Sequence, residues 1–505
     1  MDGGNAFDAA VATSAAINVV EPMTNGVGGD LFAINYIAAT REVTALNGSG
    51  RAPRGLTLDD LSTIDGGRMP QTGPHTVTVP GTVDGWSALL ARHGSRPLRA
   101  VLEPAISLAR EGFPVSEMMA RGWQRATDNV RATAETFAAF TVDGRAPRAG
   151  EVFRNPDFAD TLERIASNGR DEFYRGETAT RIVRAVRSLG GTLALDDLLR
   201  HESEWVEPIH SDYRGYRIFE CPPNGQGLAA LLALNIVGCF DLPAWGHANA
   251  DTVHAWIEAM KLAFADAREF VADPRMANVP VAELLSRDYT LRQAARVDMK
   301  RAARDVLAGR PFPGVDTEYH SVVDRWGNAC SFICSLYMSG TFGSGIVPTR
   351  TGFALQNRGA LFSLDPAHRN VFAPGKRPYH TIIPALALPL SSAEPYRVVS
   401  FGVMGGFMQP QAHLQVVSRL FDFEHNVQEA LDAPRFQITH GAHVLMEPAF
   451  ASELLDALRA RGHEVELTTW WNGTFGRGQI VAHERDSGTI VAGSEPRSDG
   501  CAIGY

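Results

Sequence analysis

A threonine a little past the middle of the chain has neighbours that suit nucleophilic chemistry. Thr317 follows a stretch rich in proline and glycine and opens a segment, TEYHSVVD, whose pattern predicts a β-strand. A turn around Trp326 leads to a second predicted strand, so the two should form an antiparallel hairpin. That turn places Thr317 opposite Ser335 or its neighbour, with Cβ atoms roughly 5 Å apart. Two hydroxyl groups are therefore expected to meet at the start of a strand.

The chemistry that suits this arrangement is an N-terminal nucleophile released by self-cleavage. The Thr317 hydroxyl would attack the carbonyl of Asp316, the acyl group would move from nitrogen to oxygen, and water would hydrolyse the ester. The new α-amine, with a pKa of about 8, needs only a modest downward shift of its pKa to accept a proton from the hydroxyl. The simpler interpretation of the same segment is an exposed threonine at a strand edge.

A pair of glycines forms a second candidate element of the site. Gly405 and Gly406 follow an apolar strand and precede a helix expected to begin near Gln409. Backbone N–H groups at such a turn can point at a developing oxyanion, and glycine lets a substrate carbonyl approach closely. The alternative is a tight turn that only needs positive φ. A dinucleotide loop is not indicated, because the GxGxxG spacing is missing.

The order of the predicted elements indicates how these groups are positioned. Strands at Leu31–Tyr36 and Glu42–Leu46 follow a buried helix, and helical patterns dominate from Ser87 to about Leu307. Strands return after Thr317, and two sheets packed face to face beneath helices would accommodate this order. The later strands are expected at His320–Phe332, Phe353–Leu355, Arg397–Phe401 and Gln479–His483.

Ten stretches in register from residue 3 to residue 500 resemble the gamma-glutamyltranspeptidase family. TEYHSVVD looks like its processing site, where the small subunit begins. The others are GGNAFDAAVA (3–12), VEPMTNGVGGD (20–30), VPGTVDGW (79–86), EAMKLAFADAREFVADP (258–274), GSGI (343–346), GKR (375–377), VMGG (403–406), EALDAPRF (429–436) and PRSDG (496–500).

The resemblance implies an α+β fold, the four-layer αββα sandwich of N-terminal nucleophile hydrolases. Residues 1–316 would form the large subunit and residues 317–505 the small one, interlocked as one domain. The partners would be the two subunits as a heterodimer, which could itself dimerise. Gly405 and Gly406 correspond to the family's oxyanion hole, and Ser335 replaces a threonine that orients the nucleophile.

Departures from the family's pattern concern the substrate. Ser49 stands where transpeptidases have the arginine that clamps the α-carboxylate, and Arg51 follows two residues later. Tyr337, Arg358 and Leu361 occupy the positions of the Asn, Gln and Asp that hold the α-ammonium. A guanidinium in place of a carboxylate would favour an anion and repel an ammonium. His380 and Thr381 replace two serines that hold the substrate carboxylate.

This pattern resembles the oxamate amidohydrolases, cephalosporin-acylase-like enzymes and transpeptidase-like hydrolases within the family. The leading interpretation is an amidohydrolase that cleaves an amide of a small anionic acid, with Arg358, Arg51 and His380 as candidates to bind the anion. The first alternative is a gamma-glutamyl hydrolase or transferase that recognises the α-amino group elsewhere, for instance at Glu21 or Asp30. The second is a scaffold that binds a small anion without turnover.

Composition narrows the remaining function classes. The 505 residues carry a formal charge of −10, and no basic stripe interleaved with aromatic residues indicates nucleic acid binding. No apolar run reaches 18 residues, so no membrane partner is predicted. The five cysteines form no CxxC pair, and neither a metal nor another cofactor is predicted. A cytoplasmic protein fits best, although export stays open because relatives usually have a lead-in before the GGNAFDAAVA stretch.

Overall fold

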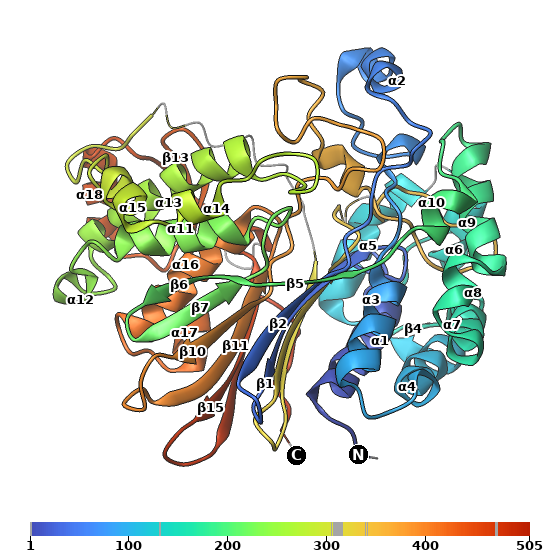
Figure 1. The fold of residues 1–505 in the computed structure, drawn as a ribbon, viewed down its shortest axis with the longest axis horizontal. Coiled ribbons are helices and arrows are strands. Elements are labelled where there is room, and N and C mark those ends of the chain that lie inside the picture. The colour runs from blue at the N-terminus through green and yellow to red at the C-terminus, as the bar shows by residue number, and fades with distance from the viewer. Residues whose placement is uncertain are drawn as a thin grey trace.

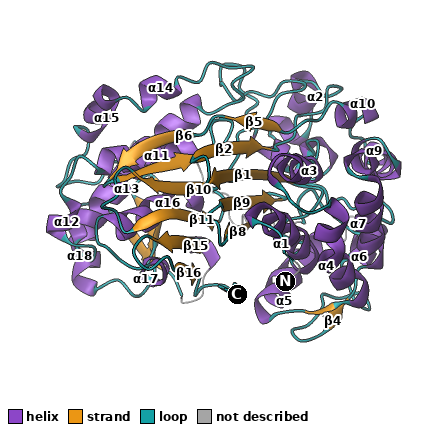
Figure 2. Ribbon diagram, turned by 60° about the horizontal axis from the view of Figure 1, so that its bottom comes forward, coloured by secondary structure: helices purple, strands orange, loops and turns teal. Residues whose placement is uncertain are grey.

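A computed structural model describes residues 3–130, 133–304, 306, 317–338, 340, 342–469 and 473–504. Two antiparallel sheets pack against each other in it (Figure 2). In the described residues the first sheet has the order β5 (Glu204–Val206), β2 (Glu42–Asn47), β1 (Asp30–Ile37), β9 (Ala329–Ser335) and β8 (Glu318–Val323). The second has the order β16 (Ile490–Ser494), β15 (Arg477–Glu484), β11 (Tyr396–Met404), β10 (Ala385–Pro389), β7 (Tyr216–Glu220) and β6 (Ile209–Tyr213).

The faces that the two sheets turn toward each other form an apolar layer. Phe32 of β1, Ile333 of β9 and Leu386 of β10 belong to it, and all three are fully buried. Side chains alternate between the two faces of a strand, so the other residues of β1 and β9 face the helices behind the first sheet. Both faces of the central strands are therefore covered.

Helices cover the outer faces of the two sheets (Figure 1). The helices α1 (Ala6–Val20), α3 (Thr82–His93), α4 (Leu98–Glu111) and α7 (Pro156–Asn168) share one core with the first sheet. The helices α11 (Gly227–Val237), α13 (Ala250–Phe270) and α16 (Met408–Phe421) share another with the second. The resulting four layers are the predicted αββα sandwich, which is thus confirmed.

Smaller elements complete the structure around these layers. The helices are α2 (Leu58–Thr63), α5 (Glu117–Val130), α6 (Ala134–Ala139), α8 (Arg170–Tyr174), α9 (Glu177–Ser188), α10 (Leu195–Leu199), α12 (Leu242–Trp245), α14 (Val281–Leu284), α15 (Arg287–Ala294), α17 (Val427–Asp432) and α18 (Ser452–Ala460). Short strands are β3 (Phe113–Pro114), β4 (Val152–Phe153), β12 (Phe436–His440), β13 (His443–Met446) and β14 (Glu464–Leu467). None of the helices in the described ranges is long and apolar enough to cross a membrane.

One predicted strand is wrong. Phe353–Leu355 joins neither sheet, because its backbone groups bond with loops: the Leu355 N–H donates to Ile346 O at 2.9 Å, and Leu355 O accepts from Ser344 N at 2.8 Å. The sequence analysis also missed β5, β6 and β7, which are strands of three to five residues within the mostly helical middle of the sequence.

Candidate active site

Thr317 and Ser335 meet as the hairpin predicts. Glu318 pairs with Cys334 in the antiparallel ladder, which puts Thr317 opposite Ser335. The Thr317 hydroxyl donates to Ser335 Oγ at 3.2 Å, and both residues are fully buried. Ser335 Oγ also accepts from the Tyr337 N–H at 2.8 Å, so the backbone fixes its position. Asp316, the predicted other side of the cleavage site, lies outside the described residues.

Gly405 and Gly406 form the turn between β11 and α16. Their φ angles are 134° and 58°, a region that favours glycine, as the tight-turn interpretation required. Their carbonyls accept from Met408 N and Gln409 N, at 3.0 and 3.2 Å, and so begin the helix. A Cβ on Gly402 would overlap the ring of Tyr319, so β11 and β8 are in contact. On β11, Gly405 comes three residues after Gly402. On β8, Thr317 comes two residues before Tyr319. Gly405 and Thr317 therefore lie at the same end of the sandwich.

Arg358 is a buried guanidinium with unused donors. Its Nη1 donates to Thr381 Oγ1 at 2.7 Å, and its Cζ lies 4.6 Å from the centre of the Tyr337 ring. Its Nε and Nη2 find no hydrogen-bond partner among the described residues, and the same holds for the Tyr337 hydroxyl. Burial lowers the pKa of Arg358 to about 10, which leaves it charged at neutral pH. Nε and Nη2 form the side of a guanidinium that binds a carboxylate in bidentate fashion.

Asp30 supplies a carboxyl group beside this arginine. Burial raises its pKa to about 6 against the opposing charge of Arg358. It accepts from Gly50 N at 2.9 Å and from Gln356 Nε2 at 2.8 Å. The Nε2 of His380 lies 3.0 Å from its other oxygen, and burial holds the pKa of His380 well below its usual range. His380 is therefore neutral and contacts Asp30.

Arg51 and Ser49 are engaged in structural contacts. Arg51 pairs with Glu204 and Asp273, each at 2.9 Å. The Ser49 hydroxyl donates to Asn47 Oδ1 at 2.7 Å. Of the residues predicted to bind substrate, Arg358 thus contacts both Tyr337 and Thr381, and the three form one group. Arg51 instead forms ion pairs with two carboxylates.

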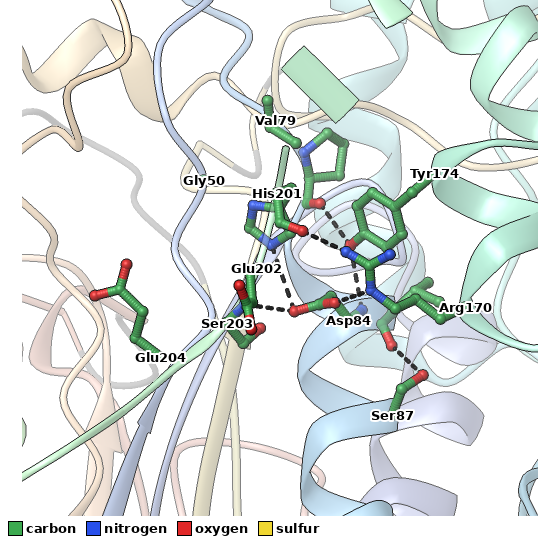
Figure 3. Close-up of polar contacts among 12 residues, drawn as sticks. Gly50, Val79, Asp84, Ser87, Arg170, Tyr174, His201, Glu202, Ser203 and Glu204 are labelled. Atoms are coloured by element: carbon green, nitrogen blue, oxygen red, sulfur yellow. Dashed lines mark hydrogen bonds and ion pairs between the residues drawn. The ribbon is translucent and has the colours of Figure 1, made fainter. Parts of the chain in front are cut away.

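A polar network around Asp84 explains one of the sequence motifs (Figure 3). Asp84, in the VPGTVDGW motif, accepts from Ser203 N at 2.5 Å and from Arg170 Nε. The Tyr174 hydroxyl donates to Pro80 O at 2.8 Å. Glu204, which pairs with Arg51, follows Ser203 directly, so the network holds the backbone next to it. Asp84 therefore has a structural role.

The loop between β7 and α11 contributes residues that the sequence analysis missed. The Nδ2 of Asn224 donates to Pro378 O at 2.8 Å and to Ser49 Oγ at 3.2 Å. The Nε2 of Gln226 donates to Thr381 O at 2.7 Å and to Gly406 O at 2.8 Å. The available signal was PPNGQG, a turn-forming stretch with two buried amides between a strand and an apolar helix.

A buried cluster in the second helical layer has metal-ligand residue types. His254, Glu258 and His463 are the group of this kind within the described ranges. The Nδ1 of His254 lies 2.7 Å from the Nε2 of His463, and the Nε2 of His254 lies 2.9 Å from Asp298 O. Lys261 Nζ donates to Glu258 at 2.8 Å. The cluster is therefore held together by its own hydrogen bonds and an ammonium group.

Comparisons with known proteins agree with this geometry. The family model described as Gamma-glutamyltranspeptidase matches residues 1–505. The chain is 37% identical to the glutathione hydrolase-like YwrD proenzyme of Bacillus subtilis, covering 99% of this chain and 94% of that protein. It is 36% identical to the oxamate amidohydrolase proenzyme of Klebsiella pneumoniae, with 100% and 95% covered.

A solved structure extends the agreement to the fold. The crystal structure of cephalosporin acylase from Bacillus halodurans superposes with a TM-score of 0.92 at 45% identity, covering 100% of this chain and 92% of that one. The chain therefore belongs to the gamma-glutamyltranspeptidase family of N-terminal nucleophile enzymes.

Proposed function

We propose that this amidohydrolase cleaves an amide of a small anionic acid, and that Arg358 binds the acid group. The observation that carries the proposal is the buried guanidinium whose Nε and Nη2 lack a partner in the described part of the chain. Asp30 offsets the charge of Arg358 when it is ionised, but the two N–H groups stay without a partner among the described residues. Buried donors without a partner are costly, and a substrate carboxylate would accept from both. The oxamate amidohydrolase and acylase names of relatives support the same class of substrate.

In the proposed mechanism, cleavage between Asp316 and Thr317 frees the α-amine of Thr317. That amine takes the hydroxyl proton as Thr317 Oγ1 attacks the amide carbonyl, with Ser335 orienting the hydroxyl. The N–H groups at Gly405 and Gly406 stabilise the oxyanion. The α-ammonium returns the proton to the leaving amine, and water then hydrolyses the acyl-enzyme ester.

Assays of the purified protein on oxamate, a glutaryl amide and a gamma-glutamyl anilide test the proposed class directly. We expect the anionic amides to be hydrolysed and the gamma-glutamyl compound to be a poor substrate, because its α-ammonium would meet Arg358. Efficient cleavage of glutathione, undiminished by excess oxamate, would contradict the proposal and favour a gamma-glutamyl hydrolase.

The variant Arg358→Gln tests the anion site itself. It should raise KM for the anionic amide roughly a hundredfold with a smaller effect on kcat, as expected for lost substrate binding. Arg419→Gln is the matched control, because Arg419 is also buried, lies over the ring of Trp256 at 5.7 Å and has two N–H groups without a described partner. Equal KM values for the wild type and Arg358→Gln would show that Arg358 does not bind the substrate.

A further inference from the structure

We propose that Gln226 is a positioning residue that sets the length of the acid the enzyme accepts, an inference that rests on the proposed function. It would do so by fixing the distance between the anion site at Arg358 and the oxyanion turn at Gly405 and Gly406. The evidence is a chain of three hydrogen bonds that joins these two places through a single side chain.

The contacts of Gln226 hold it rigidly. The residue is fully buried directly before α11, and both hydrogens of its amide group are used, on Thr381 O at 2.7 Å and on Gly406 O at 2.8 Å. Its Oε1 accepts from the Tyr379 hydroxyl at 3.0 Å. Its backbone N–H donates to His380 O at 2.9 Å. A side chain held at each polar atom has little freedom to move.

One of the two carbonyls that Gln226 binds belongs to Thr381, which contacts Arg358, and the other belongs to Gly406. Thr381 also accepts from Arg358 Nη1 at 2.7 Å, so its position follows the anion site. Gly406 belongs to the proposed oxyanion turn. Because one planar amide nitrogen donates to both carbonyls, their oxygens lie roughly 5 Å apart. The loop before Gln226 braces the same side, since Asn224 O accepts from His380 N at 2.9 Å.

This connection has a consequence for specificity. A substrate must place its carboxylate on Arg358 and its scissile carbonyl in the oxyanion hole at the same time. If the separation is fixed, only one number of carbon atoms between the two groups satisfies both ends. A methylene too many or too few then costs binding energy in the transition state. We therefore infer that the enzyme prefers one acid within a homologous series.

The test compares hydrolysis of oxamate, malonamate, succinamate and glutaramate. For the wild type we expect kcat/KM for the preferred length to exceed that of its neighbours roughly tenfold or more. Gln226→Met keeps the approximate volume and removes both donors, and it should reduce this preference to about threefold or less while lowering kcat/KM for the preferred length most.

Gln415→Met is the matched control. Gln415 is equally buried, and its Nε2 also donates to two carbonyls, Gln411 O at 3.0 Å and Phe436 O at 3.1 Å, but it touches neither Thr381 nor Gly406 in the described contacts. This variant should lose comparable stability and keep the length preference. Gln226→Glu, which retains the shape and loses the donors, repeats the test if Gln226→Met does not fold.

The outcomes separate this inference from the proposed function. A wild type that hydrolyses none of the four amides contradicts the proposed function, and the same variants are then compared on β-aspartyl and γ-glutamyl anilides. A flat length profile in the wild type, or an unchanged profile in both Gln226 variants, overturns the role of Gln226. A reduced preference in the Gln226 variants alone supports it.

Discussion

Ser335 illustrates how much one hydroxyl can contribute to the reactivity of another. It stands on β9 with its oxygen held by the Tyr337 N–H, and it accepts the hydrogen bond of Thr317. An acceptor in a fixed place keeps the Thr317 hydroxyl in a single orientation before attack. The family's threonine at this position would offer the same group, so serine preserves the role.

Ser335→Ala should therefore slow both self-cleavage and turnover by at least an order of magnitude, since a lost positioning contact of a few kcal/mol corresponds to roughly a hundredfold in rate. The measurements are the rate at which fragments appear and kcat of the processed enzyme. Ser331→Ala is the control, because Ser331 is equally buried on the same strand and its hydroxyl contacts Tyr319 at 2.9 Å. Kinetics unchanged by Ser335→Ala would exclude the orienting role.

Asp30 should make anion binding depend on pH. Its pKa, raised to about 6 chiefly by burial, means that it is neutral below pH 6 and charged above it. The ionised carboxylate offsets the charge of Arg358, whose pKa of about 10 keeps it protonated throughout this range. Binding of an anion thus favours protonated Asp30, and affinity must fall as the pH rises through 6.

We accordingly expect KM for the anionic amide to increase several-fold, up to about tenfold, between pH 5 and pH 7. Asp30→Asn should abolish this step and keep KM low at both pH values. Titration of the Thr317 amine should change kcat, so kcat and KM are determined separately at each pH and only KM is compared. A step that persists in Asp30→Asn would assign it to another group.

At the scale of elements, the sequence predicted those helices and strands that a local residue pattern determines. The Thr317 hairpin has its register because the turn after Asp324 is short, which fixes Val323 opposite Ala329 and Glu318 opposite Cys334. The buried helix α13 has a clear helical pattern. β6 and β7 were missed because they are short and lie in a stretch dominated by helices.

The candidate site was predictable only where a motif marks it. Asp30 begins β1, Gln226 follows β7, Arg358 follows β9 and Thr381 precedes β10, so their contacts arise only when the two sheets bring these strand ends together. Sequence spacing carries no information about such contacts. For the same reason the pairing of Arg51 with Glu204 and Asp273 became visible only in the folded structure.

Close contact between the sheets gives a stability prediction at Gly402. A methyl group there would overlap the ring of Tyr319, which is buried between β8 and β11. Gly402→Ala should lower the free energy of unfolding by about 1–3 kcal/mol through overpacking. Gly55→Ala is the control, since its methyl group would lie 3.4 Å from Thr192 O, an ordinary contact. Thermal unfolding of both proteins measures the difference, and equal midpoints would contradict this packing.

At the scale of the whole molecule, the position of Thr317 determines how the proposed subunits hold together. The first sheet pairs β1, from the large subunit, with β9, from the small one. The second pairs β7 with β10 across the same division. The apolar layer between the sheets also takes Phe32 and Ile333 from opposite sides of the division. Cleavage before Thr317 would remove one covalent bond and leave both sheets intact.

The purified protein is therefore expected to run as two bands on a denaturing gel, residues 1–316 and the remaining 189 residues (505 minus 316), and as one species in gel filtration. Mass analysis should place the new N-terminus at Thr317. Thr317→Ala should stay full length and inactive, because it has no nucleophile for either reaction, while its thermal unfolding should show the same fold. Recovery of an intact wild-type chain with full amidase activity would contradict the N-terminal nucleophile mechanism. Separation of the two fragments without denaturant would contradict the interlocked sheets, since a shared core of strands from both fragments cannot be parted without exposing its apolar surface to water.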